Sequence, residues 1–151
     1  MGIILDKKGL LEKIKRLKAK NKRIVFTNGC FDIIHVGHIR YLKEAKQLGD
    51  VLIIGMNSDL SVSRIKPGRP VNFEQHRAEV LSSLEMVDYV VVFDDDTPYE
   101  LIKSIKPDVL VKGGDWKKED IIGSDIARET HSLPYIEGIS TTTIIEKIKK
   151  L

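Results

Sequence analysis

Cysteine is almost absent from this sequence of 151 residues, and its scarcity excludes two kinds of site. Cys30 is the single cysteine, so no disulfide can form within the chain, and a reducing, cytoplasmic location is expected. Of the four histidines, His76 and His131 stand apart from the pair His35 and His38. No set of cysteines and histidines therefore has the spacing of a zinc site.

Long apolar runs, a strong charge of one sign and the common nucleotide-binding loops are also missing. No apolar stretch has the length of a membrane span and no leader pattern opens the chain, so a soluble protein without a membrane partner is expected. The net charge of +3 combines 25 basic and 22 acidic residues. The basic segment 10–22 reads as a solvated helix face, so no nucleic-acid partner is expected. Neither G-x-x-x-x-G-K-[ST] nor G-x-G-x-x-G occurs, which excludes the P-loop and dinucleotide-binding signatures.

Apolar runs alternate with amphipathic segments along the chain, which predicts an α/β fold. Continuous apolar strands are typical of parallel sheets, and the sequence predicts five of them, at residues 24–27, 51–56, 89–93, 108–111 and 133–136. Helices are expected at residues 9–20, 39–48, 57–65, 73–85, in a segment ending at 105, and at 142–150. The length favours a single domain over residues 1–151, with the N-terminal segment 1–22 packed on it as a helix.

A glycine turn with two histidines joins the first expected strand to the next helix. His35 and His38 are three residues apart, so they can point the same way once the helix has begun. A helix start carries unpaired backbone N–H groups and the positive end of the helix dipole, both of which favour an anion. Gly37 leaves no side chain to block the close approach of that anion. The segment therefore predicts a site that holds and polarises phosphates, at the edge of the sheet where the strands end.

Two segments carry a resemblance to a known family. Residues 28–38 read Asn-Gly-Cys-Phe-Asp-Ile-Ile-His-Val-Gly-His, and residues 138–145 read Gly-Ile-Ser-Thr-Thr-Thr-Ile-Ile. Together they resemble the HxGH nucleotidyltransferase superfamily, which includes the cytidylyltransferase-like enzymes. The resemblance runs from Arg23 to Leu151. It implies a Rossmann-like nucleotidyltransferase fold, with a five-stranded parallel sheet flanked by helices, and the transfer of a nucleoside monophosphate to a phosphate with release of pyrophosphate.

Within that superfamily the sequence is most similar to the D-glycero-β-D-manno-heptose 1-phosphate adenylyltransferases, which form the C-terminal half of bifunctional ADP-heptose synthases. The resemblance implies AMP transfer from ATP to heptose 1-phosphate, with His35 and His38 as catalytic residues. It implies four substrate-binding residues, Asn57, Asp59, Lys66 and Arg77. The nucleotide-binding positions that it implies are Thr27, Asn28, Gly29, Cys30, Phe31, Asp32, Gly37, Lys112, Gly113, Asp115, Ser140, Thr141 and Thr142.

The reaction implied by the resemblance depends on positioning and charge stabilisation. A phosphate oxygen of the acceptor attacks the α-phosphorus of the triphosphate in line, and the two histidines donate hydrogen bonds to phosphate oxygens. Mg²⁺ is expected with the triphosphate, held mainly by phosphates and water, with Asp32 as the candidate protein ligand and a turn-capping carboxylate as the alternative for it. The expected partners are ATP and a sugar phosphate, a second copy in a homodimer, and a separate sugar kinase in the pathway.

Two other functions stay open. Glycerol-3-phosphate cytidylyltransferases share both motifs, but they usually carry Arg-Thr before Glu-Gly-Ile-Ser-Thr, where this sequence has Tyr135 and Ile136. The loop at 112–115 also departs from their Gly-Asp-Asp, and both departures favour ATP over CTP. Because residues 137–140 and 114–116 still match the cytidylyl pattern, a cytidylyltransferase acting on a polyol phosphate is the alternative. A phosphate- or nucleic-acid-binding module of the same fold without catalysis would lose a histidine or the Ser-Thr-Thr segment, and both are present.

Overall fold

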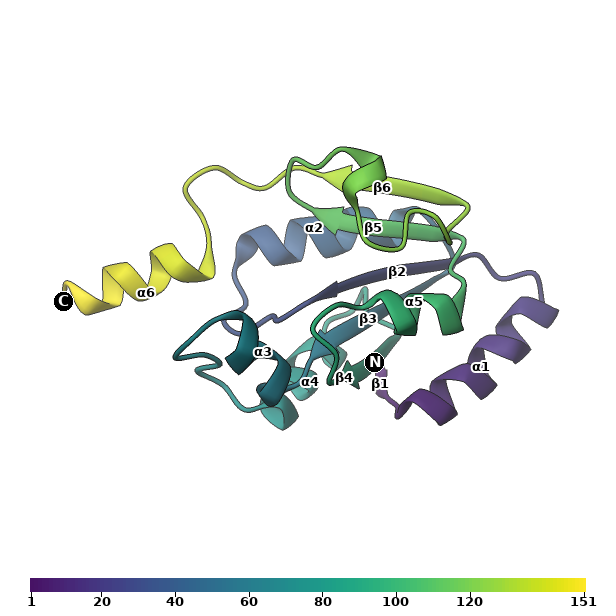
Figure 1. Ribbon diagram of the computed structural model, residues 1–151, viewed down its shortest axis with the longest axis horizontal. Coiled ribbons are helices and arrows are strands. Elements are labelled where there is room, and N and C mark those ends of the chain that lie inside the picture. The colour runs from purple at the N-terminus through teal and green to yellow at the C-terminus, as the bar shows by residue number, and fades with distance from the viewer.

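The computed structural model describes residues 1–151 and has one parallel sheet between two layers of helices (Figure 1). The strand order is β1-β4-β3-β2-β5-β6, and every neighbouring pair is parallel. The strands are β1 (Ile3–Ile4), β2 (Ile24–Gly29), β3 (Val51–Asn57), β4 (Tyr89–Phe93), β5 (Val109–Gly113) and β6 (Glu129–Leu133). The helices are α1 (Lys7–Ala19), α2 (Val36–Gln47), α3 (Asp59–Ile65), α4 (Glu74–Ser82), α5 (Tyr99–Ile105) and α6 (Thr141–Lys149), with a short 3-10 turn at Lys118–Asp120.

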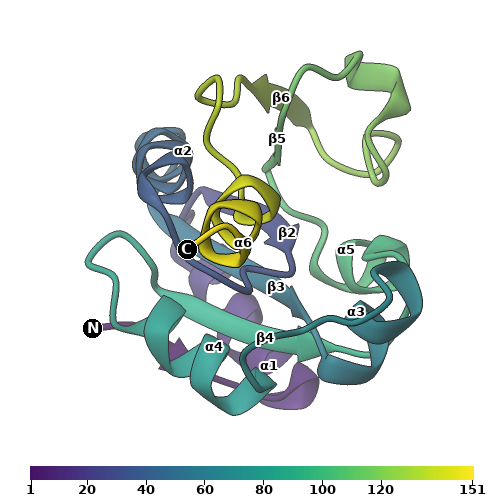
Figure 2. The same ribbon diagram turned by 90° about the vertical axis from the view of Figure 1, so that its left-hand side faces the viewer.

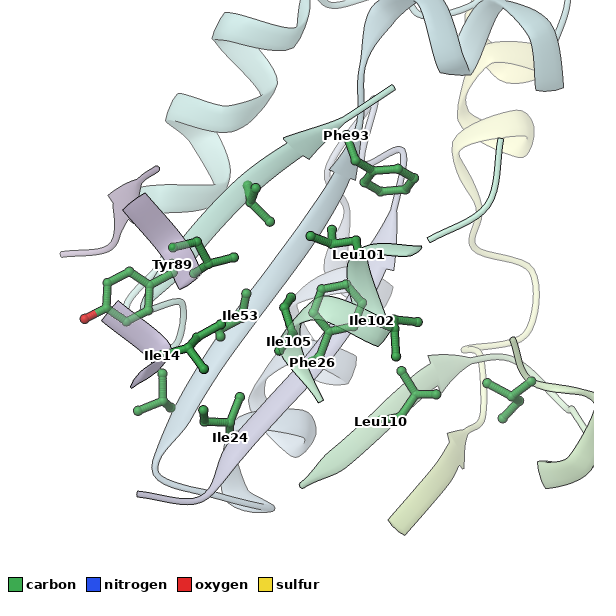
Figure 3. Close-up of a cluster of buried hydrophobic side chains, with 14 residues drawn as sticks. Ile14, Ile24, Phe26, Ile53, Tyr89, Phe93, Leu101, Ile102, Ile105 and Leu110 are labelled. Carbon is green, nitrogen blue, oxygen red and sulfur yellow. The ribbon is translucent and has the colours of Figure 1, made fainter. Parts of the chain in front are cut away.

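Alternation along the strands divides the core into two clusters. Successive strand residues point to opposite faces of a sheet. Ile24 and Phe26 therefore join the cluster under α1 and α5, whereas Val25 joins the cluster under α2 and α4. Figure 3 shows the first cluster, where Phe26 lies beside Ile102 and Ile105 of α5. The expectation of a parallel α/β fold with helices on both faces is confirmed.

The sheet has six strands, not the five that the sequence predicted. The strand β1 was not predicted because its two residues are exposed and a strand of this length is too short to show an apolar pattern. The last strand is β6, at 129–133, and not the apolar segment 133–136. As an edge strand β6 is polar and only half-buried, and Pro134 directly after it has no N–H to donate to the ladder.

Helix boundaries differ from the prediction by a few residues, and one difference affects the site. The helix α2 begins at Val36 and not at residue 39, because His35 acts as its N-cap. The helix α3 begins after Ser58, whose side chain accepts from the Ser61 amide at 3.1 Å. No side chain caps α5. None of the helices is long and apolar enough to cross a membrane.

The N-terminal helix α1 packs on the sheet. Asp6 caps α1 by accepting from the Gly9 amide at 2.8 Å, and Leu10 and Ile14 are buried in the cluster shared with α5. The helix α6 differs from the others because none of its residues is buried. Figure 2 shows α6 in front of the sheet, at the edge where the strands end. That edge holds the cleft described next.

Candidate active site

A cleft of about 680 Å³ lies at the carboxyl ends of the central strands. The turn after β2, the end of β5 and the segment that leads into α6 all contribute to its walls, so the cleft lies at the edge of the sheet where the sequence predicted a phosphate site. Most of the site residues predicted from the sequence line it: Asn28, Gly29, Cys30, Phe31, Asp32, His35, Gly37, His38, Asn57, Lys66, Lys112, Gly113, Ser140, Thr141 and Thr142.

The two histidine rings lie against each other at the start of α2, with their centroids 3.9 Å apart and their planes tilted by 33°. Nδ1 of His35 accepts a hydrogen bond from the Gly37 amide at 3.1 Å, and Nδ1 of His38 accepts one from the His35 amide at 3.3 Å. A neutral imidazole that accepts at Nδ1 carries its proton at Nε2. The helix start therefore fixes the tautomer of both rings and leaves two Nε2–H groups as donors.

Two glycines of the turn make room for side chains of the turn itself. A Cβ on Gly37 would stand 2.8 Å from Cε1 of His35, and one on Gly29 would stand 2.9 Å from Cε2 of Phe31. The Phe31 ring in turn lies 5.3 Å from the His38 ring, measured between centroids. Gly37 thus leaves room for the His35 ring to fold back over the helix start. From the sequence, the missing side chain was expected to leave room for an anion instead.

Burial keeps both histidines neutral. It lowers the pKa of His35, and it lowers the pKa of His38 to about 4, with the charges of His35 and Lys66 acting in the same direction. The unfolded chain has an ordinary histidine pKa near 6.5. Between about pH 4 and 6.5 the unfolded state therefore binds more protons than the folded state, and stability must rise with pH there.

We expect that His38→Gln will flatten this part of the pH profile. The wild-type free energy of unfolding should increase from pH 4 to 6.5 more steeply than that of the variant, as measured by urea denaturation at a series of pH values. His76→Gln, at an exposed histidine of α4, is the matched control. Parallel profiles for the wild type and His38→Gln would contradict the neutral, buried state of His38.

The start of α6 forms the second anion-favouring part of the cleft. Ser140 is the N-cap and accepts from the Thr143 amide at 3.0 Å, and the Thr143 hydroxyl accepts from the Ser140 amide at 3.0 Å. The Thr141 hydroxyl donates to the Ile33 carbonyl at 3.1 Å. That bond connects the two sequence motifs across 108 positions of the chain and brings the N-terminus of α6 beside the histidine turn.

Cationic side chains add to the positive character of the cleft. Lys66, Arg69 and Lys112 all line it, and Arg69 had not been predicted from the sequence. Burial lowers the pKa of Lys112, whose Nζ lies 5.7 Å from the centroid of the Trp116 ring. These groups, the histidine donors and the start of α6 suit a ligand that carries several phosphates.

Four predicted site residues lie outside the cleft lining. Thr27 is fully buried in β2 and donates to the Val111 carbonyl at 2.9 Å, so it joins two strands. Asp115 is exposed beyond the end of β5. Asp59 and Arg77 form an ion pair at 2.7 Å behind the cleft.

Arg77 holds the turns behind the cleft together. Its side chain is fully buried in the ion pair, and its guanidinium donates to the carbonyls of Asn72, Cys30 and Asn57 at 2.9, 2.7 and 2.8 Å. The N–H groups of the guanidinium are therefore already bonded to acceptors within the protein. The structure thus gives Arg77 a supporting position, where the sequence had predicted contact with substrate.

Asp32 fastens a neighbouring loop to the turn. Its Oδ2 accepts from the Val71 amide and its Oδ1 from the Asn72 amide, each at 2.8 Å, and its side chain is buried. Both carboxylate oxygens thus have backbone partners, as expected for the turn-capping interpretation. Across the whole chain, no three side chains of His, Cys, Asp or Glu gather as a metal-binding group.

Two cleft residues carry signals that the sequence argument did not use for the site. Tyr41 of α2 lines the cleft with a buried hydroxyl that has no hydrogen-bond partner. In the sequence, a tyrosine at helical spacing is interpreted as a core residue. Only the unpaired hydroxyl distinguishes Tyr41 from an ordinary core residue. Glu137 lines the cleft beside Gly138, in the segment before α6.

Comparison with known proteins gives one family and several close relatives. A family model described as cytidylyltransferase-like matches residues 26–147. The bifunctional protein HldE of Nitratiruptor sp. is 60% identical over 136 residues, which cover 89% of this chain and 29% of that protein. HldE of Wolinella succinogenes is 52% identical over 147 residues, which cover 97% of this chain and 31% of that protein. The chain thus spans about 30% of the length of these curated relatives.

Two solved structures share the fold. The lipopolysaccharide core biosynthesis protein from Thermoplasma volcanium has a TM-score of 0.66 and 30% sequence identity, and the match covers 77% of this chain and 99% of that one. A pantoate-beta-alanine ligase from Francisella tularensis has a TM-score of 0.62 at 18% identity, covering 100% of this chain and 79% of the ligase. The second likeness shows the fold alone.

Proposed function

The chain belongs to the cytidylyltransferase-like family, and from that premise we propose that it transfers AMP from ATP to a sugar 1-phosphate, heptose 1-phosphate, with release of pyrophosphate. The observation that carries the proposal is the pair of Nε2–H donors of His35 and His38 in the same cleft as the start of α6. This arrangement supplies donors for the phosphate that reacts and for the phosphates that leave.

The chemistry needs little beyond placement. An oxygen of the acceptor phosphate forms a bond to the α-phosphorus, the bond from that phosphorus to the bridging oxygen breaks, and pyrophosphate leaves with the electron pair. The attacking oxygen is already anionic, so no general base is required. The two imidazoles stabilise charge on the reacting phosphate, while the amides at the start of α6 bind the outer phosphates.

Mg²⁺ is the metal expected with a triphosphate, and this chain offers it few ligands. Because both oxygens of Asp32 accept backbone amides, Asp32 is poorly placed to bind a cation as well. In this proposal the ion is held by phosphates and water, which suits the preference of Mg²⁺ for retained water ligands. None of the steps assigned to the histidines depends on it.

The acceptor is assigned by resemblance and by the names of relatives. The Thermoplasma volcanium protein is named for lipopolysaccharide core biosynthesis, which agrees with a sugar phosphate as acceptor. Lys66 and Asn57 are the cleft residues proposed to meet it. A single domain over residues 1–151, a homodimer and a cytoplasmic location are further parts of the proposal. The separate sugar kinase expected from the sequence is not part of it, because the relatives are named bifunctional. In the relatives named bifunctional, two functions share one chain.

Base choice gives the test of this proposal. Tyr135 and Ile136 line the cleft where the cytidylyltransferases carry Arg-Thr, so the guanidinium that would bind cytosine is missing. Loss of such a contact changes discrimination by about 1–3 kcal/mol. With heptose 1-phosphate as acceptor, ATP should exceed CTP in kcat/KM by at least about tenfold, a ratio that corresponds to about 1.4 kcal/mol.

The measurement is pyrophosphate release with each of the four nucleoside triphosphates, against heptose 1-phosphate and glycerol 3-phosphate. The double variant Tyr135→Arg with Ile136→Thr should narrow the gap between ATP and CTP. Better use of CTP than of ATP by the unmodified protein, with either acceptor, would replace this proposal with the cytidylyltransferase alternative.

A further inference from the structure

The end of β3 carries a buried amide with one unpaired atom. Asn57 lines the cleft, although it is only 4% exposed. Its Nδ2 donates to Oγ of Ser61 at 3.0 Å, and Oγ of Ser61 donates its single hydrogen to the Asp95 carbonyl at 2.8 Å. Ser61 can therefore only accept from Asn57, which fixes the amide with Nδ2 toward Ser61. The Oδ1 atom accepts no hydrogen bond from the protein, and it is not sealed from solvent as the Tyr41 hydroxyl is.

The loop that follows β4 lies beside Asn57 and continues the same wall of the cleft. The strands β3 and β4 are parallel neighbours, and Asn57 is paired with the last residue of β4. Three residues of the loop line the cleft: Asp96, Thr97 and Pro98. The helix α3 holds this loop through the Ser61 bond and through Arg64, whose Nε donates to Asp96 at 2.8 Å. Figure 2 shows α3 beside α5, the helix that the loop leads into. Asn57 and residues 96–98 are called the β3–β4 wall below.

The β3–β4 wall offers an acceptor and a donor but no free cation. The acceptor is Oδ1 of Asn57. The donor is the Thr97 hydroxyl, whose one contact in the protein is a weak one, accepted from the Tyr99 amide at 3.5 Å. The charge of Asp96 is matched by that of Arg64 in an ion pair. A phosphate gains little from such a surface, whereas a neutral hydroxyl, which both donates and accepts, matches both groups.

We propose that the β3–β4 wall binds the hydroxyl groups of the sugar part of the acceptor. Oδ1 of Asn57 accepts from one hydroxyl, and the Thr97 hydroxyl donates to another. This inference rests on the proposed function, since it assumes a sugar 1-phosphate whose phosphate lies at His35 and His38. A site built to hydrogen-bond a substrate hydroxyl rejects a substrate that lacks it. The wall is thus the part of the cleft that distinguishes a sugar phosphate from a phosphate with few hydroxyls.

Thr97→Val tests the donor, because it removes the hydroxyl, keeps the shape of the side chain and changes an exposed position. We expect the Kd for heptose 1-phosphate, measured by calorimetry, to increase about 3- to 10-fold. The Kd for inorganic phosphate, which has no sugar, should stay within about twofold. Asn57→Ala, with circular dichroism to check its fold, should weaken heptose 1-phosphate binding at least as much. Thr130→Val, at a half-buried threonine of β6 outside the cleft, is the matched control.

Three results would overturn the inference. Equal affinity of Thr97→Val and wild type for heptose 1-phosphate would mean that the hydroxyl does not touch the sugar. Equal losses for heptose 1-phosphate and inorganic phosphate would place the β3–β4 wall on the phosphate. A wild type that binds both compounds equally well would show that sugar hydroxyls are not recognised. Selective loss of heptose 1-phosphate binding in the variants, combined with no pyrophosphate release from wild type with ATP and heptose 1-phosphate, would support the sugar contacts and contradict the proposed reaction.

Discussion

His35→Ala and His38→Ala should each lower kcat by roughly 100-fold or more, equivalent to about 2.7 kcal/mol of transition-state stabilisation. The Nδ1 atoms of both rings are occupied by backbone amides, so the Nε2–H groups are the parts of the rings free to bind a ligand. Charge grows on the phosphate oxygens during transfer, and a fixed donor binds it more strongly than it binds the ground state. Steady-state pyrophosphate release at saturating ATP and acceptor measures the effect.

The fold of both histidine variants should persist, because neither ring belongs to a core cluster. His35→Ala also removes the N-cap of α2, which costs about 0.5–2 kcal/mol of stability, so circular dichroism and a urea titration must accompany the kinetics. His76→Ala serves as the matched control at an exposed histidine. Turnover within a few-fold of wild type in either cleft variant would remove that histidine from the proposed mechanism.

Arg77→Met should lower the free energy of unfolding by about 3–5 kcal/mol, the range for breaking a buried ion pair by removing one partner. The variant leaves the Asp59 carboxylate without its cation and three backbone carbonyls without a donor. Those carbonyls belong to the turn after β2, the end of β3 and the loop before α4. The substitution should therefore weaken the contacts among all three segments. Urea denaturation at neutral pH gives the change.

Arg128→Met is the matched control for Arg77→Met. The side chain of Arg128 is 84% exposed and lies 3.8 Å from Asp108, so its removal should cost less than about 1 kcal/mol. Unchanged stability in Arg77→Met together with a large rise in KM for the acceptor would restore the substrate contact predicted from the sequence. It would also mean that the guanidinium leaves its four acceptors when substrate binds.

The sequence was most informative where one physical pattern dominates. Central strands such as β3 are continuous apolar runs, and the motif at 28–38 combines a strand end, glycines and a helix start, so both could be located without coordinates. The edge strand β6 has no such pattern, because an edge strand needs little apolar surface.

The candidate site could be predicted only as far as residue type and order allow. The histidines and the Ser-Thr-Thr segment could be singled out because motif and position agree, and the structure brings both to one cleft. The four protein acceptors of Arg77 could not be predicted, because sequence does not show which groups surround a cation. The unpaired hydroxyl of Tyr41 could not be predicted either, since it exists only once the neighbouring elements are in place.

The shallow docking of α6 has a thermodynamic consequence for any ligand of the cleft. Because α6 buries none of its residues, its position depends on few contacts, among them the Thr141 bond to Ile33 at its first turn. A ligand that binds the amides of that turn stabilises the docked helix, and by reciprocity whatever stabilises docking raises the affinity for the ligand. Substitutions far along α6 that do not contact the nucleotide would then change the affinity for it. The affinity can therefore change in evolution without any change in the residues that carry out the reaction.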